Sequence, residues 1–211
     1  MGFNGEALTC IRGDRLVFEG LSFDLAPGGC LVLRGPNGAG KSSLLRLCAG
    51  FLAPAEGRLC FDGEPIDDDR ETHCARLTYV GHLDPLKPVL TVEENLAFWA
   101  GMNGTSQSVG DALDRFGMAG LADLPARYLS AGQRRKVNLA RLATSPAVLW
   151  LLDEPTTALD DAAVAALVAL IAAHRANGGM VMAATHIDLG LPDTATLRLE
   201  APRLPVALDF E

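Results

Sequence analysis

The sequence predicts an α/β fold in which buried, mostly parallel strands alternate with helices. Residues 30–50 begin as an apolar run, continue as a glycine-rich turn and end in a segment with helical hydrophobic spacing. Residues 76–80 predict a buried strand, and the runs 148–152 and 180–184 are continuously apolar, which is typical of parallel strands buried on both faces. An alanine-rich helical segment, 161–175, separates the last two runs and restores the order strand, helix, strand.

Length and charge limit what the chain can do. Its 211 residues, 49% hydrophobic and 21% charged, suffice for one well-packed domain with a small subdomain but not for two such domains. The formal net charge of −8 excludes a general binder of nucleic acid, which needs a basic face to displace counterions. Residues 1–10 lack the blocks of a signal peptide, and the longest apolar stretch, 162–173, is too short to span a bilayer. We therefore expect any membrane contact to come through partner subunits.

The N-terminal part predicts β structure. Residues 7–34 alternate short apolar runs with turn residues. Residues 57–66 repeat this pattern, and Asp62-Gly63 predicts a hairpin turn there. The acidic run 67–69 could form a metal cluster, but a solvated loop is the favoured interpretation, because that is what such charge runs usually are.

Residues 83–143 have helical patterning and predict an inserted helical subdomain. A stretch rich in glycine, serine and asparagine, 101–110, interrupts it, and a helix is expected at 111–116. Phe98 and Trp99 are expected in the core of this subdomain rather than on a ligand platform, since aromatic side chains are usually spent on burial.

The cysteines predict a reducing cytoplasm. None of them forms a CxxC pair, and several lie inside apolar runs, where a free cysteine behaves as a small core residue. We interpret all five as buried structural thiols: Cys10, Cys30, Cys48, Cys60 and Cys74.

The glycine-rich turn after the first apolar run is a phosphate-binding loop. Gly35, Gly40, Lys41 and Ser42 fit the pattern GxxxxGK[ST], whose backbone N–H groups hold the α- and β-phosphates of a nucleotide. In this pattern the lysine reaches the β- and γ-phosphate oxygens and the serine binds Mg²⁺. Gly38 and Gly40 let the backbone close on an anion, and the helix that follows points its positive end at it. An ordinary glycine-rich turn is the alternative, and the flanking strand and helix disfavour it.

Two carboxylates follow the apolar run 148–152. Asp153 is expected to hold Mg²⁺ through its water shell. Glu154, one residue further and so facing differently, is expected to orient or deprotonate the attacking water. The alternative is a strand end with two acidic residues that have no catalytic role, and the phosphate-binding loop in the same chain disfavours it.

A second set of anion donors lies between these two motifs. Ser130 predicts an N-cap for a helix over 133–142, so Gly132 and the helix N-terminus offer hydroxyl and N–H donors. One phosphate-binding loop already serves one nucleotide, so these donors suggest a site completed by a second subunit. The basic run 134–136 is interpreted as a solvated helix face without a ligand.

These residues together resemble the ATP-binding subunits of ABC transporters, over essentially the whole chain and in the family's order. The matching motifs are Walker A at 35–42, the signature at 129–133, Walker B at 151–155, the D-loop at 157–160 and the switch histidine at 184–186. The signature reads LSAGQ, with alanine in place of one glycine. The resemblance implies a P-loop NTPase (RecA-like) core with an N-terminal antiparallel β patch. It also implies a single ATP-binding domain with its core at 1–82 and 144–211 and its helical subdomain at about 83–143.

The resemblance further implies how the protein works. ATP and Mg²⁺ would bind between the Walker A motif of one subunit and the signature of another, in a head-to-tail homodimer, with His186 on the γ-phosphate and Glu154 as the catalytic carboxylate. Mg²⁺ would be held by Ser42 and Asp153. The implied nucleotide contacts are Gly35, Pro36, Asn37, Gly38, Ala39, Gly40, Lys41, Ser42, Ser43, Ser130, Ala131, Gly132, Gln133 and Asp160.

Two positions depart from the family pattern. His82 stands where the family usually has a glutamine that contacts Mg²⁺, and it could bind water or metal or merely pack. Arg12 stands near the usual adenine-stacking aromatic, and it could stack its guanidinium plane or be a plain surface arginine.

Within the family, residues 79–82 and 90–96, together with the short opening 8–15, look like the ATP-binding subunits of cytochrome c biogenesis (haem exporter) systems. This implies integral membrane partners and a peripheral place on the cytoplasmic face of the bacterial inner membrane. Another small ABC importer or exporter, a soluble ABC ATPase and a small-molecule kinase are the alternatives.

Overall fold

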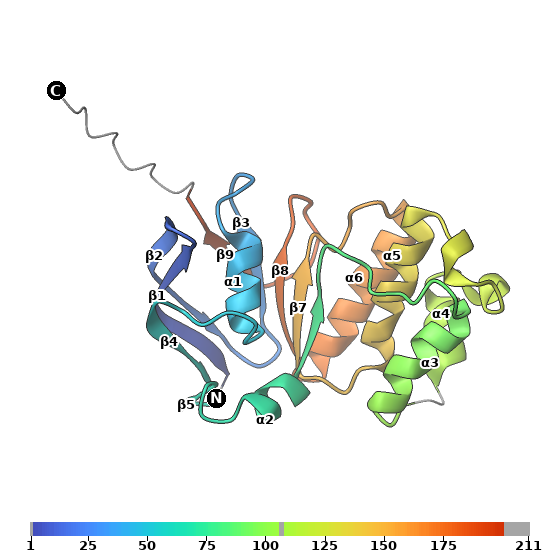
Figure 1. The fold of residues 1–211 in the computed structure, drawn as a ribbon, viewed down its shortest axis with the longest axis horizontal. Coiled ribbons are helices and arrows are strands. Elements are labelled where there is room, and N and C mark those ends of the chain that lie inside the picture. The colour runs from blue at the N-terminus through green and yellow to red at the C-terminus, as the bar shows by residue number, and fades with distance from the viewer. Residues whose placement is uncertain (1, 106–107, 201–211) are drawn as a thin grey trace.

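The computed structural model describes residues 2–105 and 108–200, which form two β-sheets with helices around them (Figure 1). The C-terminal stretch 201–211, for which we predict no function, lies outside the described residues. The antiparallel sheet has the order β2-β1-β4-β5, with strands β1 (Phe3–Arg12), β2 (Arg15–Leu25), β4 (Glu56–Phe61) and β5 (Glu64–Pro65). The parallel sheet has the order β6-β7-β8-β3-β9, with strands β6 (Leu77–Val80), β7 (Leu149–Asp153), β8 (Met180–Ala184), β3 (Cys30–Arg34) and β9 (Thr194–Arg198).

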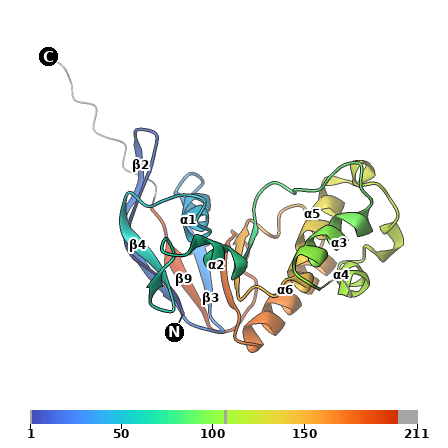
Figure 2. The ribbon, with the colours of Figure 1, turned by 60° about the horizontal axis from the view of Figure 1, so that its bottom comes forward.

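The helices and short helical turns connect these strands. The α-helices are α1 (Lys41–Cys48), α2 (Arg70–Ala75), α3 (Val92–Met102), α4 (Val109–Arg115), α5 (Ala131–Ala140) and α6 (Asp161–Ala176). Single 3₁₀ turns lie at Ala119–Leu121, Ala126–Tyr128 and Arg141–Thr144. Helices α3, α4 and α5 gather at one end of the molecule, and the antiparallel sheet and α1 lie at the other (Figures 1 and 2). No helix among the described residues has the length and apolar character needed to cross a bilayer.

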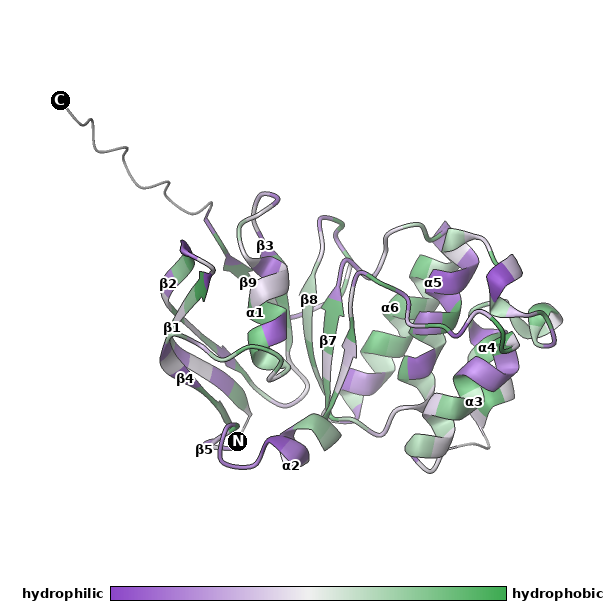
Figure 3. Ribbon diagram, viewed as in Figure 1, coloured by the Kyte–Doolittle hydropathy of each residue, from purple (hydrophilic) through white to green (hydrophobic). Residues whose placement is uncertain are grey.

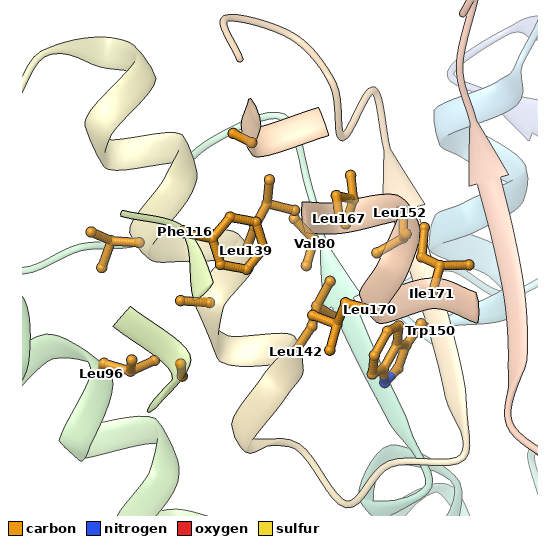
Figure 4. Close-up of a cluster of buried hydrophobic side chains, with 14 of the residues drawn as sticks. Val80, Leu96, Phe116, Leu139, Leu142, Trp150, Leu152, Leu167, Leu170 and Ile171 are labelled. Carbon is orange, nitrogen blue, oxygen red and sulfur yellow. The ribbon is translucent and has the colours of Figure 1, made fainter. Parts of the chain in front are cut away.

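The parallel sheet is buried on both faces, as its apolar runs predict. In β7, Leu149 and Leu151 face α1 and the antiparallel sheet, while Trp150 and Leu152 face the helical side. Figure 4 shows the hydrophobic cluster on the helical side, in which residues of α3, α5 and α6 meet β6 and β7. Figure 3 shows hydrophobic residues along β7 and β8, between the two layers. Each face of this sheet therefore carries its own core, and its edge formed by the strands' carboxyl ends stays available for a site.

Most of the predicted elements are confirmed. The turn between β4 and β5 is the predicted hairpin, and Asp62 and Gly63 have φ of 54° and 87°, as a type I′ turn requires. Residues 67–69 are exposed, as expected for a solvated loop, and Asp69 also caps α2 through a 3.0 Å bond from the Thr72 N–H. Sequence reasoning missed α2 and β9, because a six-residue polar helix and an exposed edge strand carry little hydrophobic signal.

Two predictions about burial are wrong. Phe98 is 48% exposed instead of lying in a core. Trp99 beside it is half-buried, with the Arg141 guanidinium 4.3 Å from its ring centroid. Cys74 is exposed on the short helix α2, whereas the other four cysteines are buried as predicted. In both cases residue type predicts burial, and the placement of the helix relative to its neighbours decides otherwise.

Candidate nucleotide-binding site

The glycine-rich loop connects β3, inside the parallel sheet, to α1. Gly40 is the N-cap of α1 at φ 98°, and a Cβ there would lie 2.6 Å from Val17 Cγ1. Gly35 has φ 149°, and a Cβ there would lie 2.3 Å from the Leu199 carbonyl oxygen. Only glycine meets both demands, so this turn brings backbone N–H groups and the positive end of α1 to the sheet's carboxyl edge.

Lys41 is buried and curls back over this loop. Its Nζ donates hydrogen bonds to the carbonyl oxygens of Gly35 (2.8 Å) and Pro36 (3.1 Å). An ammonium group has three N–H donors, so one more can serve an anion that the loop encloses. The lysine therefore both braces the loop and supplies a positive charge to it.

Ser42 and Asp153 meet across the end of the sheet. Ser42 Oγ donates to Asp153 Oδ1 at 3.0 Å, and Asp153 is only 3% exposed at the end of β7. A hydroxyl and one carboxylate are hard oxygen ligands, and Mg²⁺ commonly binds one or two carboxylates together with substrate phosphates and water. These residues fit Mg²⁺ beside the phosphate-binding loop.

Glu154 and His186 form a second pair at the same edge. His186 Nε2 lies 3.2 Å from Glu154 Oε1, and the Glu154 N–H donates to the Ala184 carbonyl at 2.8 Å. Glu154 has φ 46°, a left-handed conformation that costs a residue with a Cβ about 1–2 kcal/mol. Arg34, which sequence reasoning missed, donates to the carbonyls of residues 185 and 187 on either side of the histidine, at 2.7 and 3.1 Å.

A hollow of about 430 Å³ opens over the phosphate-binding loop and the two carboxylates, Asp153 and Glu154. Arg12 and Arg15 face one another across the β1–β2 hairpin and both line it. Arg15 is a second site candidate that sequence reasoning missed, although its place across the Gly13-Asp14 turn from Arg12 could have revealed it. The hollow is lined by Arg12, Arg15, Val17, Asn37, Gly38, Gly40, Lys41, Ser42, Ser43, Asp153 and Glu154.

The signature residues lie elsewhere. Ser130 caps α5 in a capping box with Gln133, with bonds of 3.2 and 2.8 Å. Helix α5 packs against the face of the parallel sheet opposite α1 (Figure 1). Gly132 abuts the loop after β7, since a Cβ there would lie 2.7 Å from the Ala158 carbonyl oxygen. One chain thus presents its phosphate-binding loop and its signature on separate surfaces.

Several other predicted residues also do not line the hollow: Gly35, Pro36, Ala39, His82, Asp160 and His186. Asp160 caps α6 through a 2.8 Å bond from the Ala163 N–H and pairs with Lys136 Nζ at 2.6 Å. The hydrogen bond from Lys136 holds the pKa of the Asp160 carboxyl below its ordinary value. His82 is exposed in the loop after β6, so it does not pack in the core, and it does not line the hollow.

The interpretation of 134–136 as a solvated face is wrong for Arg135. This side chain is only 4% exposed and donates to the carbonyl oxygens of Asp153 (2.9 Å) and Glu154 (2.8 Å). The signal that could have revealed it is helical spacing, because Arg135 shares one side of α5 with Asn138 and Leu139, which are both fully buried.

Comparison with known proteins agrees with this architecture. The family model for ABC transporters matches residues 18–157. Proteins named cytochrome c biogenesis ATP-binding export protein CcmA are 57% identical in Rhodospirillum rubrum (94% of this chain, 85% of that protein) and 53% identical in Paramagnetospirillum magneticum (94% of each). A solved ATP-binding subunit of an ABC transporter shares the fold, with a TM-score of 0.85 at 24% identity over 95% of this chain and 88% of that one. The predicted fold class is therefore confirmed, and the chain belongs to the ABC transporter family, among its ATP-binding proteins of the CcmA group.

Proposed function

We propose that this protein is the ATP-hydrolysing subunit of a membrane ABC complex that serves cytochrome c biogenesis, by haem export or by release of a haem-loaded chaperone. The ATPase part rests on the Glu154–His186 pair, 3.2 Å apart beside the phosphate-binding loop. The cytochrome c part is supported by the likeness to proteins named for that process over 94% of the chain.

The reaction follows from the groups at the sheet edge. The loop N–H groups and Lys41 bind the phosphates. Ser42 and Asp153 would hold Mg²⁺, which would supply positive charge beside the phosphates. Glu154 takes a proton from water, the water oxygen bonds to the γ-phosphorus, and the bond to the ADP oxygen breaks. His186, held at Glu154, donates a hydrogen bond to the γ-phosphate. Arg12 at the rim of the hollow is our candidate for contact with the nucleotide base.

The separate placement of the signature supports a shared site. Ser130, Ala131 and Gly132 point no donor into the chain's own hollow, because α5 begins on the other side of the sheet. A head-to-tail dimer would bring the N-terminus of α5 from one copy to the phosphates bound by the other. We propose that ATP binding forms this dimer and that hydrolysis releases it.

An exposed apolar surface beside α3 is suited to contact with a protein partner. A hollow of about 380 Å³ between the parallel sheet and α3 is lined by apolar residues that include Phe51, Trp99 and Met102. In the neighbouring loop 81–91, Leu83 is 81% exposed. Exposed apolar clusters of this kind mark protein contacts. We propose that integral membrane subunits dock here, which would hold the protein on the cytoplasmic face of the bacterial inner membrane.

The test is the content of c-type haem in a strain that lacks this protein. Wild type should restore it, and Lys41→Ala should not, because a charge-assisted phosphate contact is lost. Arg115→Ala, an equal loss of charge at an exposed position on α4, is the matched control and should restore it. Unchanged haem in the deletion strain would reject the cytochrome c role.

A variant of the catalytic carboxylate distinguishes the alternative functions in experiments on the purified protein. Glu154→Gln should bind ATP, turn over slowly and accumulate as a dimer. Membrane proteins that co-purify with this dimer would support a transporter, whereas soluble partners alone would favour a soluble ABC ATPase. Transfer of phosphate to a metabolite by a monomer would favour the kinase alternative.

A further inference from the structure

Arg135 is a buried charge at the junction of α5, β7 and the loop after β6. Its Nη1 donates to the Gly81 carbonyl at 2.7 Å and lies 3.2 Å from Asp84 Oδ1. Its Nη2 donates to two consecutive carbonyls, those of Asp153 at 2.9 Å and Glu154 at 2.8 Å. A planar guanidinium can hold four acceptors at fixed angles, which the compact ammonium group of lysine cannot do.

The two carbonyls at Nη2 belong to the residues that carry the chemistry. Glu154 stands in the left-handed region at φ 46°, a conformation that persists only where surrounding contacts hold it. The Glu154 N–H donates to the Ala184 carbonyl, and the Thr157 N–H donates to the Glu154 carbonyl at 3.2 Å. Arg135 binds the carbonyls of Asp153 and Glu154, which lie on either side of the Glu154 φ angle. The guanidinium therefore fixes the backbone angles that aim the Glu154 carboxylate at His186.

Arg135 also belongs to a network of hydrogen-bonded side chains along α5. Asp84 Oδ1 also accepts a 2.7 Å bond from Asn138 Nδ2, and Asn138 Oδ1 accepts a 3.1 Å bond from Arg141 Nη1. Arg141 Nη2 donates to the Tyr79 carbonyl at 3.1 Å. Burial lowers the pKa of Arg141 to about 10, which leaves it charged at neutral pH. The spacing 135, 138, 141 puts all three side chains on one side of the helix.

We propose that Arg135 is a positioning residue for ATP hydrolysis: it holds Glu154 in its strained conformation and ties this carboxylate to the loop at Gly81–Asp84. It does not line the hollow over the phosphate-binding loop, and it acts through the backbone of Glu154. Because one guanidinium holds both segments, a displacement of the loop that carries His82 also displaces Glu154. The inference deepens the proposed ATPase function and rests on it for its kinetic test.

The kinetic test compares Arg135→Ala and Arg135→Lys with Arg134→Ala, the same loss of charge one residue earlier on α5. Misplacement of a catalytic group by about 1 Å can cost on the order of 100-fold in rate, so we expect kcat to fall about 10- to 100-fold in both Arg135 variants. The Kd for ATP should stay within about two-fold, because Lys41 and its loop are untouched. Millimolar guanidinium chloride should restore part of the kcat of Arg135→Ala, and equal sodium chloride should not. A kcat within about three-fold of Arg134→Ala, or an equal loss of ATP binding and kcat, would overturn the proposal.

A second readout needs no catalysis. The chain has four histidines, so the ring signals of His186 in an NMR spectrum can be assigned with His186→Gln. If Arg135 aims Glu154 at His186, these signals should shift in Arg135→Lys, in the direction seen in Glu154→Gln, and stay in place in Arg134→Ala. An unmoved His186 signal in a folded Arg135→Lys protein would refute the positioning role even if the protein hydrolysed no ATP. Equal ATP turnover by wild type and Glu154→Gln would instead reject the proposed base, and the NMR comparison would still judge Arg135.

Discussion

Gly132→Ala tests the close contact between the signature helix and the loop after β7. A Cβ at Gly132 would lie 2.7 Å from the Ala158 carbonyl oxygen, which belongs to the backbone and cannot rotate away. An ordinary contact needs about 3.4 Å or more, so helix and loop must separate by roughly 0.7 Å; overpacking of this kind typically costs about 1–3 kcal/mol. For a chain of 211 residues each kcal/mol lowers Tm by about 2–4 °C, so a loss of about 2 kcal/mol predicts a drop of roughly 4–8 °C.

The matched control is Gly110→Ala. Gly110 is also the second residue of its helix, α4, and a Cβ there meets no atom within 4 Å. Alanine in an open helical position stabilises by about 0.5–1 kcal/mol relative to glycine, so Tm should rise slightly. Thermal unfolding followed by circular dichroism measures both variants. If Gly132→Ala melted within 1 °C of wild type, or no lower than Gly110→Ala, the contact with Ala158 would not be the constraint we infer.

Three further predictions follow from burial and capping. Cys74 is the exposed thiol, so one thiol per folded chain should react quickly with dithionitrobenzoate and the rest only in denaturant; two or more fast thiols would contradict the burial of the others. Burial lowers the pKa of His73 and His174, so as pH falls the unfolded chain takes up protons at a higher pH than the folded chain does. The urea concentration at the midpoint of unfolding should therefore fall as pH drops from 7.5 to 5.5, and a midpoint that does not change would contradict this. Asp160→Ala removes the N-cap of α6 and should cost about 1 kcal/mol in unfolding free energy, whereas Asp160→Asn, which can still accept from the Ala163 N–H, should cost much less; equal losses would reject the cap.

Much of the fold was predictable because its signals are local. Apolar runs of four or five residues mark β3, β7 and β8, three of the four residues of β6 are hydrophobic, and glycines mark the turns that need positive φ. The elements that were missed, α2 and β9, are short and polar. Their structure depends on the Asp69 cap and on pairing with β3, and pairing between strands this far apart in sequence leaves no local pattern.

The residues of the candidate site also fall into those that local sequence predicts and those that depend on the fold. Lys41, Ser42, Asp153 and Glu154 could be named from the sequence because phosphate chemistry requires these residue types at these spacings. Their meeting at one sheet edge follows from the parallel order of β3, β7 and β8, which places the strand ends together. Arg15 joins the site through the β1–β2 hairpin, and the Gly13-Asp14 turn is a sequence signal for it. Arg34 joins the site through the pairing of β3 with β8, so only its place in the fold reveals it.

The sequence by itself determined the phosphate-binding loop, the two carboxylates, the order of these motifs along the chain and the family that shares them. Only the tertiary structure decided which charged and aromatic side chains are buried. Arg135 and Phe98 show why: a charge can be buried only where acceptors surround it, and an aromatic side chain is buried only where another element covers it. For Arg135 the acceptors come from Gly81, Asp84 and β7, which are distant in sequence, so no pattern within α5 specifies them.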